Sequence, residues 1–279
     1  MPSCQVQAEG RYREAVQIGA VTEILWEAAE AAIVPRFRAL ADGEVCEKTP
    51  GEVVTVADRE AEELIAPRLR SLVNAPVVGE EAAAGDPSLV SALRQAPAAW
   101  VVDPLDGTAN FVAGRPEWAV MAAMVRGGQT VAAWIVRPTD NRVYVGELGS
   151  GAWRNGARVQ RAPAPADTTE LRGAALTRFL DPAARARVLA AAPMFAELGP
   201  GLSCCGFDYP RLVDGELDFV LFRRTLPWDH APGALLLSEA GGTARRADGT
   251  AYRPDDDRVG LLGAADDRCW NLVRPLLFP

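Results

Sequence analysis

An apolar run that ends in two closely spaced acids, within residues 98–108, constrains this chain more than any other feature. The run is bounded by Pro97 and Pro104, which predicts a short buried strand. Asp103 and Asp106 follow it, so the Asp-Pro-x-Asp sequence predicts a tight turn that brings both carboxylates together. Because two like charges so close resist joint ionisation, we expect a divalent cation with oxygen ligands between them.

Gly107 and Thr108 predict the start of a helix that continues through Phe111. The free backbone N–H groups at a helix start bind anions such as phosphate. Acids, a cation and an anion site in one short segment indicate metal-assisted phosphoryl chemistry. The alternative is that Asp103 and Asp106 are ordinary turn residues, because Asp-Gly is a frequent turn dipeptide.

Two further segments carry acids beside apolar residues. The first is a short apolar run that ends in Glu80-Glu81, a pair that on a solvated loop is usually surface charge. The second contains Asp229 in the sequence Pro-Trp-Asp-His-Ala-Pro-Gly. Its simplest interpretation is helix capping, with Asp229 as the N-cap, Pro232 in the first turn and Gly241 as the C-terminal stop. A capping acid near other acids can also ligate a metal.

Together the three segments resemble the inositol monophosphatase family, within the lithium-sensitive, magnesium-dependent phosphatase superfamily. The family pattern is Glu-Glu, then Asp-Pro-(Ile/Leu)-Asp-Gly-Thr, then Trp-Asp-x-Ala-x-Gly ahead of Gly-Gly, and all three occur here in order. Two weaker elements agree: Lys48 followed by Val-Thr-Val-Ala-Asp at 54–58, and Gly-Ser-Gly-Ala-Trp-Arg-Asn-Gly at 149–156. The resemblance runs from about residue 11 to the C-terminus.

The resemblance implies two or three Mg²⁺ ions and water as the attacking nucleophile. It implies a first Mg²⁺ on Glu80, Asp103 and the Leu105 carbonyl, a second on Asp103, Asp106 and Asp229, and a third, looser ion held by Glu80 through water. Catalytic roles are implied for Glu80, Thr108 and Asp58, in which Asp58 orients Thr108 and Thr108 helps to position and deprotonate the water.

Substrate contacts are expected at Asp106, at the Gly107 and Thr108 backbone N–H groups, and at Ser203, Cys204, Cys205, Phe222 and Arg223. Several of these positions depart from the family pattern. Phe222 stands where the family has a hydroxyl-binding Glu, and Ser203-Cys204-Cys205 replaces a Gly-Thr-Ala loop. Arg223 and Arg224 either meet an anionic group of the substrate or are a solvated basic pair.

We therefore expect a Mg²⁺-dependent phosphomonoesterase, with an inositol or sugar phosphate as the first candidate substrate. Histidinol phosphate and 3'-phosphoadenosine 5'-phosphate are the alternatives within the superfamily. A regulatory or binding protein that retains the fold is the alternative from another class. His230, the only histidine, should face away from Asp229, because neighbouring helical residues point about 100° apart.

The resemblance also implies the fold, an α/β (α+β) layered αβαβα sandwich with the site between two halves. We expect residues 1–160 to form an N-terminal α+β half with an antiparallel sheet and most metal ligands. Residues 161–279 should form a C-terminal α/β half that supplies Asp229 and substrate contacts, after a linker at 162–167. Periodicity predicts an amphipathic helix within 11–40, a second helix after the Thr55-x-x-Asp58 capping box, and strands at 118–125, 130–136 and 142–147.

Composition excludes some classes of protein. The net charge of −8 over 279 residues argues against an electrostatic nucleic-acid binder, and no apolar run approaches the ~20 residues of a membrane span. The five cysteines lack metal-binding spacing, so we expect free thiols in a reducing cytoplasm. The partner expected is a small phosphate monoester, and the resemblance implies a homodimer.

Overall fold

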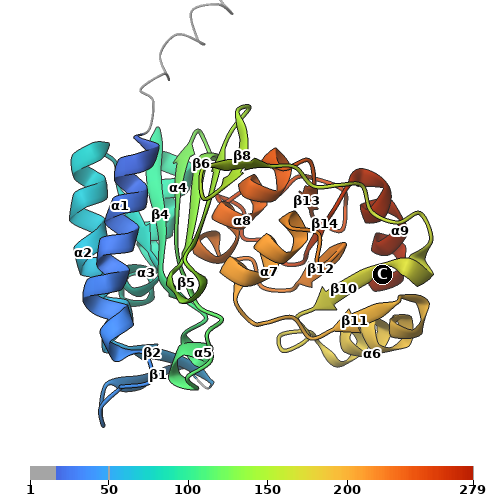
Figure 1. The fold of residues 1–279 in the computed structure, drawn as a ribbon, viewed down its shortest axis with the longest axis horizontal. Coiled ribbons are helices and arrows are strands. Elements are labelled where there is room, and N and C mark those ends of the chain that lie inside the picture. Colours follow the sequence, from blue (N-terminus) through green and yellow to red (C-terminus); the bar gives the residue numbers. More distant parts are fainter. Residues whose placement is uncertain (1–16, 50, 279) are drawn as a thin grey trace, which may run out of the picture.

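The computed structural model describes residues 17–49 and 51–278, which form five alternating layers of helices and sheets (Figure 1). Helices α1 (Ile18–Ala28) and α2 (Val56–Leu72) form the first layer, and a seven-stranded sheet forms the second. Helices α7 (Cys205–Val213) and α8 (Pro227–Glu239) lie between this sheet and a five-stranded sheet. Helices α6 (Pro182–Ala191) and α9 (Asp267–Leu277) complete the αβαβα sandwich, which confirms the predicted fold.

The seven-stranded sheet follows the order β3-β4-β5-β6-β7-β8-β9. Only the β3–β4 pair is parallel, and the other neighbours are antiparallel. The three strands predicted from the sequence correspond to β5, β6 and β7 and are confirmed. The bounds are β3 Val77–Gly79, β4 Ala98–Asp106, β5 Ala119–Arg126, β6 Gln129–Arg137, β7 Arg142–Glu147, β8 Gly151–Arg154 and β9 Ala157–Val159.

The five-stranded sheet has the order β11-β10-β12-β14-β13, with β10 parallel to both β11 and β12. The predicted linker at 162–167 connects the last strand of the seven-stranded sheet to the first strand of the five-stranded sheet along the chain, and it contains neither helix nor strand. The division of the chain into halves at residue 160 stays a prediction. The strand bounds are β10 Arg172–Ala175, β11 Glu197–Gly199, β12 Phe219–Phe222, β13 Thr243–Arg245 and β14 Leu261–Ala264.

The first helical layer follows the predicted amphipathic pattern. In α1, Val21, Ile24, Leu25 and Ala28 are buried at helical spacing. The α-helix passes into a π-helical turn (Ala29–Ile33) and a 3₁₀ turn (Val34–Arg36), so the predicted helix ends earlier than residue 40. Pro35 within the last turn has no N–H to continue the ladder. Residues 11–16 of the prediction lie outside the described residues.

Helix α8 is central because it lies between the two sheets and contacts strands of both. Its residues are apolar on almost every side, as expected of a helix that is covered all round. No described helix combines the length and the apolar character that crossing a membrane requires. The remaining elements are β1 (Val45–Thr49), β2 (Glu52–Thr55), α3 (Glu80–Gly85), α4 (Ala92–Gln95), α5 (Thr108–Val112) and 3₁₀ turns at Pro87–Ser91, Pro138–Asp140, Thr168–Glu170 and Ala192–Met194.

Candidate active site

The two acids of the Asp-Pro-x-Asp motif lie within a strand, and the predicted tight turn is wrong. Strand β4 continues to Asp106, with Asp103 opposite Met121 and Asp106 opposite Ala119 on β5. Three steps along β4 therefore match two along β5, which is a β-bulge. Pro104 is tolerated there because a bulge leaves one residue unpaired. The bulge places both acids at the end of the strand next to α5.

Asp103 and Asp106 are both buried and each accepts hydrogen bonds. The Leu105 N–H donates to Asp103 Oδ1 at 3.1 Å. The Cys204 thiol and the Gly206 N–H donate to Asp106 Oδ2 at 2.9 Å and 2.6 Å. Burial raises the pKa of Asp106 to about 6 in spite of these donors. Burial, followed by the charges of nearby acids, raises the pKa of Asp103 well above its usual range.

Asp58 and Thr108 are joined as the resemblance implied. Thr55 caps α2, and both its N–H and its hydroxyl donate to Asp58 Oδ2, at 2.8 Å and 2.6 Å, so the predicted capping box is confirmed. The Thr108 hydroxyl lies 2.9 Å from Asp58 Oδ1 and also 2.9 Å from the Leu105 carbonyl oxygen. Burial raises the pKa of Asp58 to about 6. One side of Asp58 therefore holds the helix start and the other holds Thr108.

Glu80 and Glu81 open helix α3, directly after β3. Lys48 Nζ lies 3.1 Å from Glu80 Oε1 and also pairs with Glu81. Burial raises the pKa of Glu81 to about 7. The pair is therefore more than surface charge, since it shares a lysine from strand β1.

Glu62 supports this pair and was missed by sequence reasoning. Its carboxylate accepts the Glu81 and Ala82 N–H groups at 2.8 Å and 2.9 Å, which caps α3. A Cβ on Gly79 would lie 2.3 Å from that carboxylate, so a larger residue here would displace the Glu62 carboxylate from the N–H groups that it caps. Nothing in the sequence around Glu62 distinguishes it from the neighbouring acids of α2.

Asp229 is the acid that the C-terminal part of the chain contributes. It is the third residue of α8, and the helix is preceded by Leu226, so the predicted N-cap role is wrong. Pro227 occupies the first helical position, and Pro232 lies in the interior. Burial raises the pKa of Asp229 well above its usual range, followed by the charges of Glu80 and Asp106. Acids from the N-terminal and C-terminal parts of the chain therefore lie close enough for their charges to interact.

The donor chemistry of this cluster fits a hard divalent cation. In residues 17–49 and 51–278, no three acid, thiol or imidazole side chains lie close enough together to ligate one metal ion as they stand. The carboxylates nevertheless raise the pKa values of one another, and a positive charge among them would relieve that repulsion. Carboxylate and carbonyl oxygens are the ligands that Mg²⁺ and Ca²⁺ prefer.

The predicted loop partners lie beside the acids. Gly107 precedes α5 in the left-handed region (φ 85°), where a Cβ would lie 2.7 Å from the Glu117 carbonyl. Cys204 precedes α7, and its thiol contacts Asp106. Burial raises the pKa values of the Cys204 and Cys205 thiols well above their usual range, so both are thiols. The described cysteines form no disulfide, as predicted, and Cys4 lies outside the described residues.

Phe222 and the two arginines after it separate onto different faces. Phe222 is 1% exposed, and its ring stacks on Tyr209 with centroids 4.9 Å apart. Arg223 lines a cavity beside α6. Arg224 pairs with Glu52 on β2, and its positive charge partly offsets the rise in the pKa of Asp229. Substrate contacts by Phe222 and Arg223 stay predictions that this packing does not support, and Arg224 is the arginine on the side of the acids.

His230 is a structural residue. It is 1% exposed, with Nδ1 2.9 Å from the Tyr209 hydroxyl and Nε2 2.9 Å from the Arg224 carbonyl. Burial lowers the pKa of His230 to about 3, so the ring is neutral. Both nitrogens are engaged away from the acids, in keeping with the predicted orientation.

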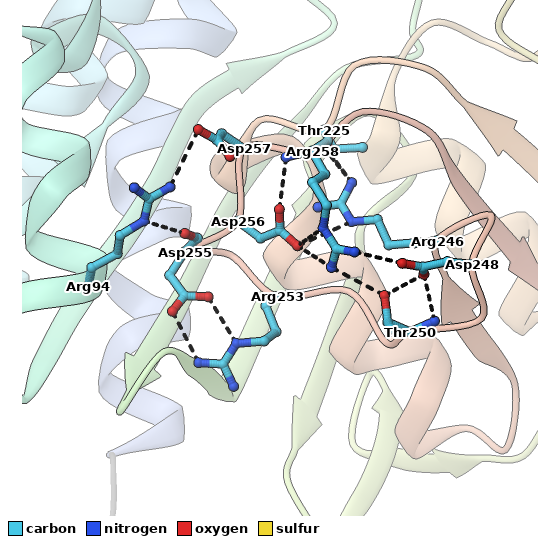
Figure 2. A network of polar contacts seen from close by, with 10 residues as sticks. All are labelled: Arg94, Thr225, Arg246, Asp248, Thr250, Arg253, Asp255, Asp256, Asp257 and Arg258. Atoms are coloured by element: carbon cyan, nitrogen blue, oxygen red, sulfur yellow. Dashed lines mark hydrogen bonds and ion pairs between the residues drawn. The ribbon is translucent and has the colours of Figure 1, made fainter.

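A loop between β13 and β14 holds the start of α8 (Figure 2). The buried Arg246 donates to the Thr225 hydroxyl at 3.0 Å, and that hydroxyl donates to the Arg258 carbonyl at 2.6 Å. Farther along, Arg94 of α4 donates to the Asp255 carbonyl at 2.6 Å. The loop therefore links the start of α8, the helix that carries Asp229, to helix α4 in the N-terminal part of the chain. Sequence reasoning missed this network.

An αβαβα sandwich with acids at the end of one strand of its first sheet and at the start of the helix between its two sheets is the architecture of a class of small-molecule phosphatases. The chain belongs to the inositol monophosphatase family, whose model matches residues 13–270, and it is a phosphoric monoester hydrolase. It is 33% identical over 208 residues to an inositol-1-monophosphatase SuhB from Mycobacterium tuberculosis, which covers 72% of this chain and 71% of the relative. It is 27% identical over 201 residues to a fructose-1,6-bisphosphatase/inositol-1-monophosphatase from Thermotoga maritima, covering 68% and 70%. A solved calcium-bound protein of the family from Staphylococcus aureus superposes with a TM-score of 0.79 at 17% identity, covering 94% of each chain.

Proposed function

We propose that the protein hydrolyses a small phosphate monoester with the help of Mg²⁺, and that an inositol or sugar phosphate is the first candidate substrate. The observation that carries the proposal is that Asp103, Asp106, Asp229 and Glu80 lie close enough for their negative charges to interact. Beside them, the Thr108 hydroxyl is held by a hydrogen bond to Asp58. The names of the relatives from M. tuberculosis and T. maritima support the substrate class. The calcium in the S. aureus structure supports a divalent cation.

Glu80, Asp103, the Leu105 carbonyl, Asp106 and Asp229 would hold the metal ions. Bound Mg²⁺ would screen the phosphate oxygens, lower the pKa of a bound water and stabilise the leaving alkoxide. Asp103, Asp106 and Asp229 fit this task because burial, followed by the charges of neighbouring acids, raises their pKa values, and a bound cation would offset both effects.

Thr108 would position the attacking water. With its hydrogen directed to Asp58, its oxygen lone pairs are free to accept a hydrogen bond from water. The first N–H groups of α5 have no partner within the helix and would bind a phosphate oxygen. Asp106, held by the Cys204 thiol and the Gly206 N–H, would keep the 203–205 loop next to the substrate.

The experiment is phosphate release from a panel of monoesters, each with Mg²⁺ and with EDTA. The panel contains inositol 1-phosphate, fructose 1,6-bisphosphate, glycerol 2-phosphate, histidinol phosphate and 3'-phosphoadenosine 5'-phosphate. We expect Mg²⁺-dependent release with the inositol or sugar esters as the best substrates. Equal release in EDTA would contradict the metal assignment, and preference for either of the last two esters would contradict the substrate class.

A further inference from the structure

A second cavity, of about 360 Å³, lies between α6, the C-terminal end of α9 and the end of strand β12. Its walls are mainly apolar and include Val188, Leu221 and Leu277. At its margin Val259 is 52% exposed, so the apolar surface reaches the solvent. The charged residues of the lining are Arg187, Arg223 and Asp181.

This cavity lies on the other side of the five-stranded sheet from α7 and α8. Leu221 belongs to the hydrophobic core shared with α6 and α9, whereas Phe222 belongs to the core shared with α7 and α8. Side chains alternate across a strand, so Arg223 follows Leu221 onto the α6 and α9 side. Asp229 lies in α8, on the opposite side. The cavity is therefore distinct from the acid cluster.

The charges around the cavity are unbalanced in favour of cations. Within the described chain, neither the Arg187 nor the Arg223 guanidinium has a hydrogen bond or ion pair. Asp181, the acid of the lining, caps α6, and its Oδ1 accepts the Ala184 N–H at 2.8 Å. Two unpaired guanidinium groups beside an apolar wall match an anion with an apolar body.

The position of the cavity in the sheet also favours ligand binding. Strands β10 and β12 are parallel neighbours, and the chain leaves β10 for β11 on one side and reaches β12 on the other. In open α/β sheets, ligands bind beyond the carboxyl ends of such strands, where the connections diverge. Arg223 directly follows the carboxyl end of β12.

We propose that this cavity binds an amphipathic anion: a carboxylate, sulfonate or phosphate head held by Arg187 and Arg223, with an apolar body of about one or two rings against Val188 and Leu221. The site needs no metal and uses none of the acids of the candidate active site. It is therefore independent of the proposed phosphatase substrate.

The test uses two fluorescent probes that differ only in an anionic group. 8-Anilinonaphthalene-1-sulfonate carries the sulfonate, and N-phenyl-1-naphthylamine lacks it. Titration of the full chain should show saturable binding of the sulfonate and clearly weaker binding of the neutral probe. Arg187→Ala and Arg223→Ala should each weaken sulfonate binding roughly tenfold, as expected for the loss of a charge-assisted hydrogen bond.

Two further variants separate charge from shape. Ala184→Trp fills the cavity without removing a charge and should abolish sulfonate binding. Arg115→Ala removes an exposed arginine elsewhere and should leave it unchanged. Thermal melts check that each variant folds, and Arg223→Gln replaces Arg223→Ala if that variant does not. Equal affinity of the sulfonate for the wild type and both arginine variants, or unchanged binding to Ala184→Trp, would overturn the proposal.

Discussion

The hydroxyl of Thr108 lies 2.9 Å from Oδ1 of Asp58, a residue fifty positions earlier in the chain. The other oxygen of the same carboxylate receives the N–H and hydroxyl of Thr55. Asp58 therefore cannot turn without uncapping α2, which makes it a rigid acceptor for Thr108. A hydroxyl with a fixed orientation is suited to positioning a water molecule.

The first prediction tests this pair. Thr108→Val removes the hydroxyl and preserves the shape of the side chain, so kcat should fall about 100-fold, within the range for loss of a positioned proton-transfer group. Thr108→Ser keeps the hydroxyl and should retain most of the activity. The measurement is the steady-state rate of phosphate release at saturating Mg²⁺. Similar rates for Val and Ser would remove Thr108 from the mechanism.

The second prediction concerns Asp103. Asp103→Asn should lower activity at least about 100-fold, since even the partners of metal ligands typically cost 10- to 100-fold when changed. Because burial and neighbouring acids raise the pKa of Asp103, loss of its charge should also raise the melting temperature in EDTA. The checks are turnover with saturating Mg²⁺ and thermal unfolding without it. Near-wild-type turnover would show that Asp103 is not a ligand.

The third prediction concerns pH. Burial raises the pKa of Asp58 and Asp208 to about 6 and that of Glu81 to about 7. A carboxyl with a raised folded pKa binds its proton more tightly in the folded state, so its contribution is full below about pH 4 and is lost as the pH rises through the folded pKa. In EDTA, the free energy of unfolding should therefore fall between about pH 5 and about pH 8. His230, with its pKa lowered to about 3, acts in the opposite sense below about pH 6.5, but it is one group against these three and Asp106, whose pKa burial also raises to about 6.

Asp208 provides the control for this pH dependence. It is fully buried and is not among the proposed metal ligands. Asp208→Asn should flatten the decline in stability, while Asp167→Asn, at an exposed acid whose pKa is lowered by the Thr169 N–H, should not. Urea unfolding at several pH values gives the slopes. A stability that rises with pH across this window would contradict the assigned directions.

The fourth prediction is inhibition by lithium. The family resemblance implies that Li⁺ occupies a magnesium position after the ester is cleaved. Phosphate release should therefore fall with LiCl and stay constant with the same concentration of KCl, which matches the ionic strength. Inhibition by both salts alike would point to general screening.

The fifth prediction separates the two arginines. Arg224 lies on the side of the acids and Arg223 does not. If Arg224 binds a second anionic group, Arg224→Ala should lower kcat/KM for fructose 1,6-bisphosphate, and the loss should correspond to ~1.5–3 kcal/mol of transition-state stabilisation. Glycerol 2-phosphate should be nearly unaffected, and Arg223→Ala should affect neither ester. Equal losses on both esters would indicate that Arg224 only holds Glu52.

Local sequence was sufficient for features that depend on short spacing. The Thr55-x-x-Asp58 capping box and the strands between residues 119 and 147 both follow from residues near each other in sequence. The start of α8 was predicted wrongly, because the sequence analysis took Asp229 as the N-cap, whereas Pro227 occupies the first helical position, which suits proline.

Features that depend on distant partners could not be predicted in the same way. The bulge in β4 is set by its register with β5, which the Asp-Pro-x-Asp sequence does not contain. Glu62 gains its role from backbone N–H groups of α3, and Arg246 gains its role from the Thr225 hydroxyl in the segment before α8. Arg223 and Arg224 lie on opposite sides of the sheet, and to predict this from the sequence the end of β12 would have to be known to within one residue.

The connection between the two sheets has a consequence for biosynthesis. Glu80, Asp103 and Asp106 precede it in the chain, whereas Asp229 follows it, in a helix that contacts both sheets. A ribosome delivers the chain from its N-terminus, and N-terminal parts fold first. The emerging polypeptide therefore carries three of the four proposed metal ligands well before the fourth exists, and on that proposal its cation site is complete only when α8 is synthesised and docks.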